Sequence, residues 1–540
     1  MVRVDSLGLG ILTAIRKSFA DIARVYGDRF TLATLPAEDP QVYAMACRAD
    51  TVGVFQIESR AQMNMLPRLR PQCFYDLVVE ISLVRPGPIQ GDMVHPYLRR
   101  RTGIERIEYA HPDLEPILRK TCGVPLFQEQ ILKMAMAVAG FTPGEADELR
   151  RAMGVWRRDG GMLLERMGEK FRRGLVAKGV PDAAAERIFA QIAGFAEYGF
   201  PESHAASFSV LVYATLYLKR YYPDAFVTGL LNSQPMGFYA SHSLVADAER
   251  HGVVFAPACV NASDWDNRVD ALRHVRLGLR EIAGLREEFG RAVADERRER
   301  GPFESLRQFV ERLGRRRAPT RRDLLLLAQS NAFAALVSDR REALWQAQGL
   351  DLKRSELEPT DETPTTLPEE TPWERVALDY EAQGLSLWAH PMALLRNDLD
   401  GRGILSSQGL RFRENGALVT VAGLVICRQM PPTASGVFFL TLEDEVGFAN
   451  LVIWNTVFEK YRDVLLNETL LVVHGRLQRT ETGLSRGTKS RNARSAPTDK
   501  PLRKGSPDEK PLLHVVAETI EPLRRVAPGA TLAIESNDFG

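Results

Sequence analysis

Apolar residues recur at three- and four-residue spacing through residues 40–265, as in VPLFQEQILKMAMAVAGF and SFSVLVYATLYLKRYY. This period places the apolar side chains on one face of a helix, so the spacing predicts one large α-rich domain. From 270 to 340, shorter helical patterns alternate with glycine-containing turns, as in LREIAGLREEFGRAVADERRERGPFESLRQFVERLG. That alternation is typical of a compact helix-hairpin-helix region.

The pattern changes after residue 410. The runs ALVTVAGLVICR, VFFLTLEDEV, FANLVIW, ETLLVVHGRL and PLLHVVAETI are rich in β-branched and aromatic residues, with turn residues between them. Five short strands of this kind predict a small barrel of the OB type. The predicted fold class is therefore multi-domain α+β, mostly helical, with a C-terminal OB-type β-barrel.

Two segments lack the large apolar residues that a folded core needs. Residues 351–372 are rich in Pro, Thr and Glu, and 356–374 hold seven acids and no base, which predicts a linker. Residues 479–510 hold nine basic and four acidic residues, which predicts a disordered basic insertion in the barrel. Inside it, GLSRGTKS (483–490) does not have the spacing of a phosphate-binding P-loop.

Composition narrows the class of protein. With 540 residues, 45% hydrophobic and 26% charged, the chain is long enough for three or four domains. It has no apolar run of membrane-spanning length and the start MVRVDSLGLG lacks signal-peptide features, so we expect a cytoplasmic protein. Five cysteines without a C-x-x-C pair argue against a zinc site or a disulfide framework.

The net charge of +1 conceals a local excess of basic residues. Residues 291–322 carry eleven arginines against five acids. A basic stretch of this kind is suited to contact phosphate groups, whereas the overall charge is not informative.

The segment TPGEADELRRAMG (142–154) carries the first candidate chemistry. Thr142 and Glu145 form a predicted capping box at the start of a helix of about three turns. Arg150 and Arg151 leave its last turn together, and such a pair of guanidinium groups is able to grip a triphosphate. They equally complement the helix C-terminal dipole or face solvent, and spacing alone favours this simpler role.

Two further segments carry candidate polar groups. In YGFPESHAASF (198–208), Ser203 and His204 fall in the first turn of a predicted helix, where a neutral histidine is able to donate to a phosphate oxygen or a base. Such a histidine is more often a packed residue. Asp5 lies where a predicted strand ends and is placed to reach a divalent metal, although an aspartate there is more often a helix cap.

Six segments occur along the chain in the order VDSLGLGILTAI, GVFQIESR, LVRPGPIQ, FQEQILKMA, ELRRAMG and FPESHAASF. In this order they resemble segments of the bacterial C-family DNA polymerases, which are the replicative polymerase III α subunits and their error-prone relatives. The run QMNMLPRLRPQCFYDLVVEISLVRPGPIQGDMVHPYLRRR is more similar to the error-prone, damage-tolerant branch. The resemblance implies a translesion DNA-directed DNA polymerase, in which a primer 3′-hydroxyl attacks the α-phosphorus of a dNTP with two Mg²⁺ ions.

The resemblance also implies a domain order and a set of site residues. The implied domains are the end of the palm (1–20), fingers (21–265), a tandem helix-hairpin-helix region (266–345), a linker (346–372), a connecting helical segment (373–410), an OB-fold (411–522, insertion 479–510) and a tail (523–540). Asp5 matches the last of three metal-binding aspartates of the family. Arg150 and Arg151 match the arginines that hold the incoming triphosphate, and Ser203 and His204 match a motif that lines the nucleotide site.

The family's other two aspartates lie in a PDxDxD-like motif of the palm, preceded by a metal-binding PHP domain, and neither pattern occurs in this sequence. One aspartate cannot organise two Mg²⁺ ions. We therefore expect a C-terminal portion that is inactive without a palm.

DNA contacts are expected farther along the chain. Backbone amides of the turn IAGLRE (282–287) are able to meet duplex phosphates, and nearby arginines add salt-dependent affinity, although the turn could equally belong to a plain α-hairpin. The arginines expected to bind DNA are Arg286, Arg291, Arg297 and Arg298. Of the barrel aromatics Phe438, Phe439, Phe448 and Trp454, we expect no more than one to stack on single-stranded template.

The expected partners are primer-template DNA, dNTP and, by the resemblance, a sliding clamp and a Y-family-like accessory protein. Two other classes remain open. One is a non-catalytic nucleic-acid-binding protein that keeps the fingers, hairpin and OB modules, and the other is a scaffold that binds repair proteins through its linker and barrel. A triphosphate grip by Arg150 and Arg151 would exclude the scaffold.

Overall fold

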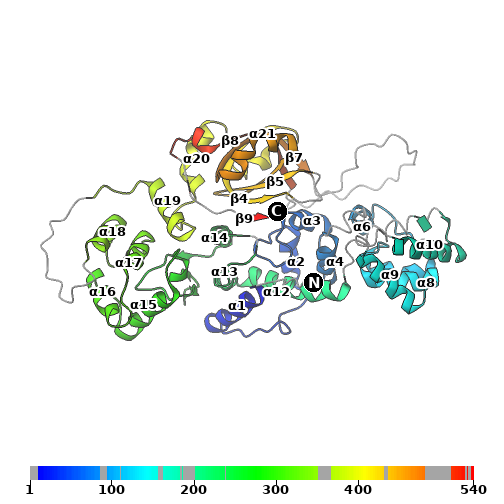
Figure 1. Cartoon of the computed structure of the whole chain (residues 1–540), viewed down its shortest axis with the longest axis horizontal. Coiled ribbons are helices and arrows are strands. Elements are labelled where there is room, and N and C mark those ends of the chain that lie inside the picture. Colours follow the sequence, from blue (N-terminus) through cyan, green and yellow to red (C-terminus); the bar gives the residue numbers. More distant parts are fainter. Residues whose placement is uncertain are drawn as a thin grey trace. The chain divides into compact units, whose positions relative to one another are not determined.

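The computed structural model describes residues 10–84, 94–109, 111–155, 162–182, 185–186, 201–237, 239–350, 367–430, 436–480, 512–529, 532 and 537–539. The chain divides into two compact units (Figure 1). The helical unit spans residues 31–220 in its described part. The barrel unit combines the chain up to Phe30, residues 221–480 and the chain after Lys510. None of the described helices is long and apolar enough to cross a bilayer.

The helical unit consists of a series of helices, several of which begin at a side-chain cap. Its elements are α2 (Pro40–Cys47), α3 (Arg60–Leu69), α4 (Phe74–Leu83), α6 (Val94–Arg101), η1 (Pro112–Leu114), α7 (Glu115–Leu118), η2 (Arg119–Thr121), α8 (Gln128–Ala139), α9 (Pro143–Val155), α10 (Met162–Ala177) and α12 (Glu202–Tyr221). Asp39 caps α2, and Ser59 with Gln62 forms a capping box at α3. The capping box predicted from the sequence at Thr142 and Glu145 is confirmed at α9.

Helix α10 lies against the end of α8 at a distance that only glycine allows. A Cβ atom added to Gly174 would lie 2.2 Å from the carbonyl oxygen of Ala139. Phe141 and Phe171 seal the same contact, with ring centroids 6.0 Å apart at an interplanar angle of 74°. Helices α8, α9 and α10 therefore form one tightly packed group.

The barrel unit contains the remaining elements. The helices are α1 (Ile11–Val25), α13 (Pro223–Leu231), α14 (Ser241–Arg250), η3 (Leu279–Glu281), α15 (Glu287–Arg300), α16 (Leu306–Gly314), α17 (Arg321–Gln329), α18 (Arg340–Gly349), α19 (Pro372–Gln383), α20 (Pro391–Gly401), η4 (Gly409–Phe412), α21 (Asn455–Asn467) and η6 (Leu523–Arg525). The strands are β1 (Phe255–Ala256), β2 (Arg268–Val269), β3 (Val275–Arg276), β4 (Leu418–Gln429), β5 (Phe438–Asp444), β6 (Gly447–Ile453), β7 (Leu470–Thr480), β8 (Leu512–Pro522) and β9 (Asn537–Phe539).

The resemblance implies fingers over 21–265, but residues 21–30 and 221–265 belong to the barrel unit. Helix α1 packs against α13, where a Cβ on Gly229 would lie 2.4 Å from Ser18 Oγ and 2.6 Å from the carbonyl oxygen of Ala14. Just beyond α1, the Tyr26 hydroxyl donates to the carboxylate of Asp224 at 2.7 Å. This close pairing joins residues about 200 positions apart in the sequence.

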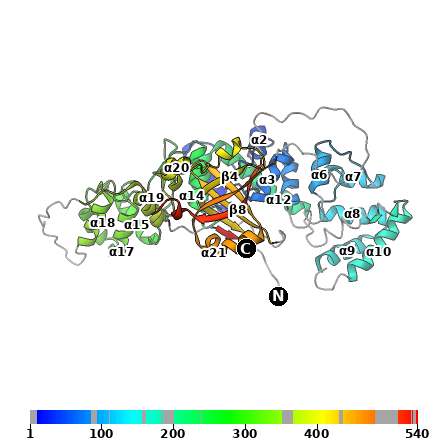
Figure 2. The ribbon, with the colours of Figure 1, turned by 90° about the horizontal axis from the view of Figure 1, so that it is seen from above.

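The five predicted strands are confirmed, and their pairing is that of an OB barrel. Strand β4 pairs antiparallel with both β5 and β7, β5 pairs with β6, β6 pairs parallel with β8, and β8 pairs with β7, which closes the ring. Strands β4 and β8 and helix α21 of this barrel are seen in Figure 2. Helix α21, which the strand pattern does not predict, packs Phe458 and Leu465 into the barrel core. Strand β9 adds to β4 in parallel.

Strand β4 is buried on both of its faces, which explains its nearly continuous apolar sequence. Val419, Val421 and Val425 face the barrel core. Ala422 and Leu424 join a second core that α19 and α20 complete on the outside of the strand. The barrel therefore folds with a helical cover over β4, and the connecting segment 373–410 is part of the barrel structure.

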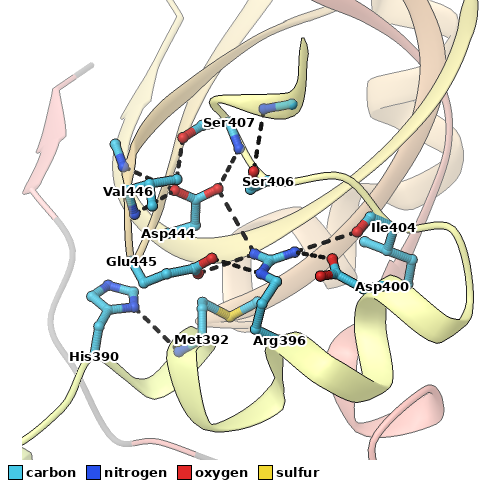
Figure 3. Close-up of polar contacts among 12 residues, drawn as sticks. His390, Met392, Arg396, Asp400, Ile404, Ser406, Ser407, Asp444, Glu445 and Val446 are labelled. Carbon is cyan, nitrogen blue, oxygen red and sulfur yellow. Dashed lines mark hydrogen bonds and ion pairs between the residues drawn. The ribbon is translucent and has the colours of Figure 1, made fainter. Parts of the chain in front are cut away.

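A polar network attaches α20 to the turn after β5 (Figure 3). The guanidinium of Arg396 donates to both carboxylate oxygens of Glu445, at 2.6 and 3.0 Å, and to the carbonyl of Ile404 at 3.3 Å. Asp444, 3% exposed, accepts from the backbone and hydroxyl of Ser407. The helical cover and the barrel are thus joined by charged as well as apolar contacts.

Two boundaries differ from the prediction. Helix α18 continues to Gly349, so the first four residues of the predicted linker 346–372 are helical, and 351–366 lie outside the described residues. Strand β7 includes Arg479 and Thr480, which pair with β8, so the predicted insertion at 479–510 overlaps the end of a strand. Residues 481–511 lie outside the described residues.

The close contact of α10 with α8 gives the first prediction. Gly174→Ala should lower the free energy of unfolding of the helical unit by roughly 1–3 kcal/mol, because the added methyl meets backbone that cannot move aside easily. Gly144→Ala, in α9 where no atom lies within 4 Å of the added Cβ, is the matched control and should cause no loss. Urea unfolding followed by circular dichroism measures both variants, and equal midpoints would contradict the packing.

The Arg396 network gives the second prediction. Arg396→Met should destabilise the barrel unit by about 3–5 kcal/mol, since it leaves two largely buried carboxylates without their cation. Arg462→Met, which removes an exposed pair with Glu459 on α21, should cost no more than about 1 kcal/mol. Combining Arg396→Met with Glu445→Gln should recover part of the loss in urea unfolding, and strict additivity of the two losses would disprove the coupling.

Candidate functional site

The first turn of α12 carries Ser203 and His204, as the sequence predicts. Its start is held by two other helices of the unit. The backbone N–H of Glu202 donates to Glu129 Oε2 on α8 at 3.0 Å, and the Tyr75 hydroxyl of α4 donates to Glu202 Oε1 at 2.8 Å. Glu129 thereby supplies the acceptor that a first-turn amide lacks within its own helix.

His204 is placed by aromatic contacts. Its ring centroid lies 4.2 Å from that of Phe208, one turn along α12, and Phe208 packs edge-on against Phe55 at 5.4 Å. Phe55 is 8% exposed and belongs to the segment GVFQIESR. The imidazole therefore lies against Phe208, which is itself packed on a side chain from about 150 residues earlier in the chain.

The GVFQIESR loop is itself anchored to α12. Lys219, 3% exposed, donates to the carbonyl of Val52 at 3.0 Å and lies 3.2 Å from the carboxylate of Asp50. The Thr51 hydroxyl donates to the carbonyl of Ile57 at 2.7 Å and closes the loop. The segments GVFQIESR, FYDLVV, FQEQILKMA and FPESHAASF thus meet around α12, although they are scattered between residues 53 and 208.

Glu58, at the end of this loop, is buried beside the same helix. Burial raises the pKa of its carboxyl to about 8, with partial opposition from a backbone hydrogen bond at Gly53 and from the Lys219 ammonium. The carboxyl is therefore mostly protonated at neutral pH.

The predicted triphosphate arginines lie in the second half of α9, which packs with α8 and α10. Arg151 is exposed and forms an ion pair with Asp147, one turn earlier, at 2.7 Å. The side chain of Arg150 and the whole of Asp5 lie outside the described residues. The triphosphate grip and the metal ligand therefore remain predictions.

The four arginines expected to bind DNA all have acidic partners. Arg286 pairs with Asp323 at 2.6 Å, and Arg291 pairs with Glu287 at 2.8 Å. These pairs involve exposed guanidinium groups that remain accessible to phosphate.

Arg297 and Arg298 share the carboxylate of Asp264, but their exposure differs. Arg297 lies 2.8 Å from Asp264, donates to the carbonyls of Val260 and Ser263, and has a side chain only 12% exposed. Arg298 is 61% exposed and also pairs with Asp295. Arg297 therefore holds the fold together, whereas the DNA role of Arg298 stays a prediction.

The IAGLRE turn is covered by the chain that follows the linker. The N–H of Ala283 donates to the carbonyl of Ala382 at 2.8 Å, and the N–H of Leu285 donates to Ile282. Gly284 has a φ of +78°, a left-handed backbone conformation that glycine adopts without steric strain. Two of the amides considered for phosphate contact are thus used inside the chain.

Of the four barrel aromatic residues that the sequence suggests for stacking, one is largely exposed to solvent. Phe438 is 4% exposed in the barrel core, and Phe448 stacks on Tyr239 with ring centroids 6.3 Å apart. Phe439 is half-buried, whereas Trp454 is 53% exposed. This pattern is compatible with one stacking residue among the four.

Sequence reasoning did not identify Glu129, Tyr75 and Phe55 as residues that position the candidate site. Glu129 lies within the quoted segment FQEQILKMA, but its cap acts on α12 rather than on its own helix. The hydrogen bond spans 73 residues, so no local sequence signal indicates it.

Comparison with protein families matches three parts of the chain to known modules. Residues 11–179 match the bacterial DNA polymerase III alpha subunit finger domain. Residues 252–343 match the helix-hairpin-helix motif, and 419–491 match the OB-fold nucleic acid binding domain. The chain thus carries, in this order, a fingers part, a helix-hairpin-helix part and an OB-fold part.

Similar curated proteins carry the name error-prone DNA polymerase. Those from Dechloromonas aromatica and Alkalilimnicola ehrlichii are 49% and 50% identical over 480 and 482 residues, and that from Methylococcus capsulatus is 47% identical over 511 residues. The alignments cover 88–89% of this chain but 46–48% of the relatives, so the chain spans about half their length. The chain is homologous to the C-terminal portion of the error-prone DNA polymerases, with their fingers, helix-hairpin-helix and OB parts.

The buried carboxyl of Glu58 gives a prediction with a defined pH window. Its folded-state pKa of about 8 exceeds the ordinary 4.5, so its neutral form stabilises the fold at low pH, and this contribution is lost as the pH rises through 8. Glu58→Gln should therefore raise the free energy of unfolding at pH 9 by roughly 2–4 kcal/mol and change it little at pH 5.

Urea unfolding of the helical unit at pH 5, 7 and 9 measures this effect. Glu148→Gln, an exposed position on α9, is the control and should follow the wild-type curve at each pH. A Glu58→Gln gain that is equal at pH 5 and pH 9 would show that the carboxyl does not titrate in this window.

Proposed function

We propose that this chain supplies the part of an error-prone DNA polymerase that holds the incoming dNTP and the DNA. The observation that carries the proposal is the meeting of four family-like segments around the start of α12, where Ser203 and His204 lie on a helix end fixed by Glu129 and Tyr75. A site that receives a nucleotide repeatedly needs groups that are already in place, because alignment is most of what a protein contributes to phosphoryl transfer.

The chemistry of the α12 start suits a nucleotide. The positive end of the helix dipole and the exposed Ser203 hydroxyl favour an anionic or polar ligand. The imidazole of His204, stacked on Phe208, offers a ring nitrogen to a phosphate or a base. The carboxylates of Glu129 and Glu202 are already engaged in hydrogen bonds, so the triphosphate charge is left to the arginines of α9.

The role of metal ions in this proposal rests on the family resemblance. Two Mg²⁺ ions would stabilise the attacking 3′-oxygen and the departing pyrophosphate when bound. Asp5, which lies outside the described residues, is the carboxylate that the resemblance assigns to them.

The other two modules supply contacts to DNA. The helix-hairpin-helix region brings the arginine-rich stretch 291–322, and the OB barrel brings a fold suited to single strands. Primer-template DNA and dNTP are therefore the proposed ligands. A sliding clamp and a Y-family-like accessory protein are further partners that the resemblance suggests.

A nucleotide-binding measurement tests the proposal. Arg151→Ala should weaken the binding of a fluorescent dNTP to the full chain in Mg²⁺ by about 10- to 100-fold, the usual loss for one charge-assisted contact. Arg173→Ala on α10 is a closely matched control, because Arg173 is 75% exposed and pairs with Glu169 one turn away, as Arg151 is 70% exposed and pairs with Asp147. The control should bind dNTP like the wild type.

The result separates the proposal from its alternative. If the wild-type chain binds DNA with a steep salt dependence but neither it nor any variant binds dNTP, the chain is a non-catalytic nucleic-acid-binding protein. If Arg151→Ala and Arg173→Ala lower the dNTP affinity equally, the effect is one of overall charge, and Arg151 does not bind the triphosphate specifically.

A further inference from the structure

Phe412 is the most exposed large apolar side chain among the described residues, at 83%. It lies at the end of η4, in the turn that precedes the first barrel strand, and no sequence pattern singles it out. A single exposed apolar residue needs no explanation by itself. Phe412 differs from a scattered surface residue because its backbone is held on both sides and arginines flank it.

The turn that carries Phe412 is fastened to the end of β7. Arg479 donates from Nη1 to the carbonyls of Arg411 at 2.8 Å and Arg413 at 3.5 Å, one on each side of Phe412. The N–H of Arg479 also donates to Asn415 Oδ1 at 2.8 Å. One arginine therefore clamps the backbone on both sides of the aromatic ring.

The same turn is held at its other end by the network around Arg396 (Figure 3). Asp444 accepts from the N–H and the hydroxyl of Ser407, and the hydroxyl of Ser406 accepts from the N–H of Gly409 at 3.2 Å. Phe412 thus projects from a backbone that is fixed before and after it. A side chain on a fixed backbone loses less conformational entropy when it binds a partner than one on a loop that has to be ordered first.

The charges beside the ring are mainly positive. Arg411 and Arg413 are exposed, and neither has an acidic partner within the part of the chain that the structure describes. Glu414 follows Arg413 in the chain, and the guanidinium of Arg479, which donates to the carbonyls of Arg411 and Arg413, adds a further positive charge. Cations beside an exposed aromatic face favour a polyanion that carries aromatic rings of its own.

We propose that Phe412 is a stacking platform for one base of a single-stranded nucleic acid, with Arg411 and Arg413 against the flanking phosphates. This site lies on the turn before the barrel and is separate from the barrel aromatics that the sequence suggests. The proposal rests on the proposed function, because it adds a contact for DNA that the chain holds. An acidic protein segment is the alternative occupant, and it has no use for an aromatic ring that stacks.

Fluorescence anisotropy of labelled oligodeoxythymidylate with the full chain tests the proposal. Phe412→Ala should weaken binding about tenfold and Phe412→Leu nearly as much, whereas Phe412→Trp should bind at least as well as the wild type, since stacking needs a ring. Leu466→Ala, which removes a 46% exposed apolar side chain on α21 of the same barrel, is the control and should have no effect.

Converting Arg411 and Arg413 to Gln should reduce the steepness with which the logarithm of the binding constant falls with the logarithm of salt concentration. The expected reduction is about 1.4, from two phosphate contacts of about 0.7 each.

Photo-cross-linking with 5-iododeoxyuridine, followed by mass spectrometry, should identify Phe412 as a contact. If the wild type binds the oligonucleotide but Phe412→Ala binds equally well and no cross-link forms at Phe412, this proposal is wrong and the proposed function stands. If Phe412→Leu binds like the wild type, an apolar contact replaces stacking and the proposal is overturned. Failure of the wild-type chain to bind any DNA would overturn both.

Discussion

Polar groups that leave water must find partners inside the chain, and this requirement shapes both units. At the start of α12, a first-turn amide has no acceptor in its own helix, and the carboxylate of Glu129 from α8 supplies one. In the barrel unit, Asp444 is almost fully buried and is satisfied by Ser407 and by backbone amides of its own turn. In both cases, the partner fixes a segment that carries a candidate ligand group, His204 in one unit and Phe412 in the other.

Two buried acids show where this requirement is met only in part. Neither carboxyl oxygen of Glu80 on α4 has a hydrogen-bond partner among the described residues, and burial raises its pKa well above the ordinary value. Glu58 is buried as well, with its pKa raised to about 8. A buried acid is tolerated as the neutral form, at a cost in stability when it ionises. Both residues lie in segments that carry the family resemblance, and departures from an ideal core gather at functional segments.

The sequence predicted those features that depend on neighbouring residues. The capping box at Thr142, the helix that begins at FPESHAASF and the five barrel strands are all set by side chains within a few positions of one another, and the structure confirms them. The family resemblance, carried by short segments in order, is likewise supported by the matched modules. Boundaries were less predictable, because the last residues of β7 pair with β8, and Arg321 of α17 donates to the carbonyl of Leu350 at the end of α18.

The sequence by itself therefore determined the types of element, their order and the residues that are able to carry chemistry. Tertiary structure alone decided which of those residues meet. It joined α1 to α13 across about 200 residues, brought Phe55 to Phe208 beside His204, buried both faces of β4, and committed Arg297 to internal acceptors while leaving Phe412 open. The reason is physical: helix, strand and cap signals act over one or two turns, whereas burial and ion pairing depend on contacts between positions that the chain order does not relate.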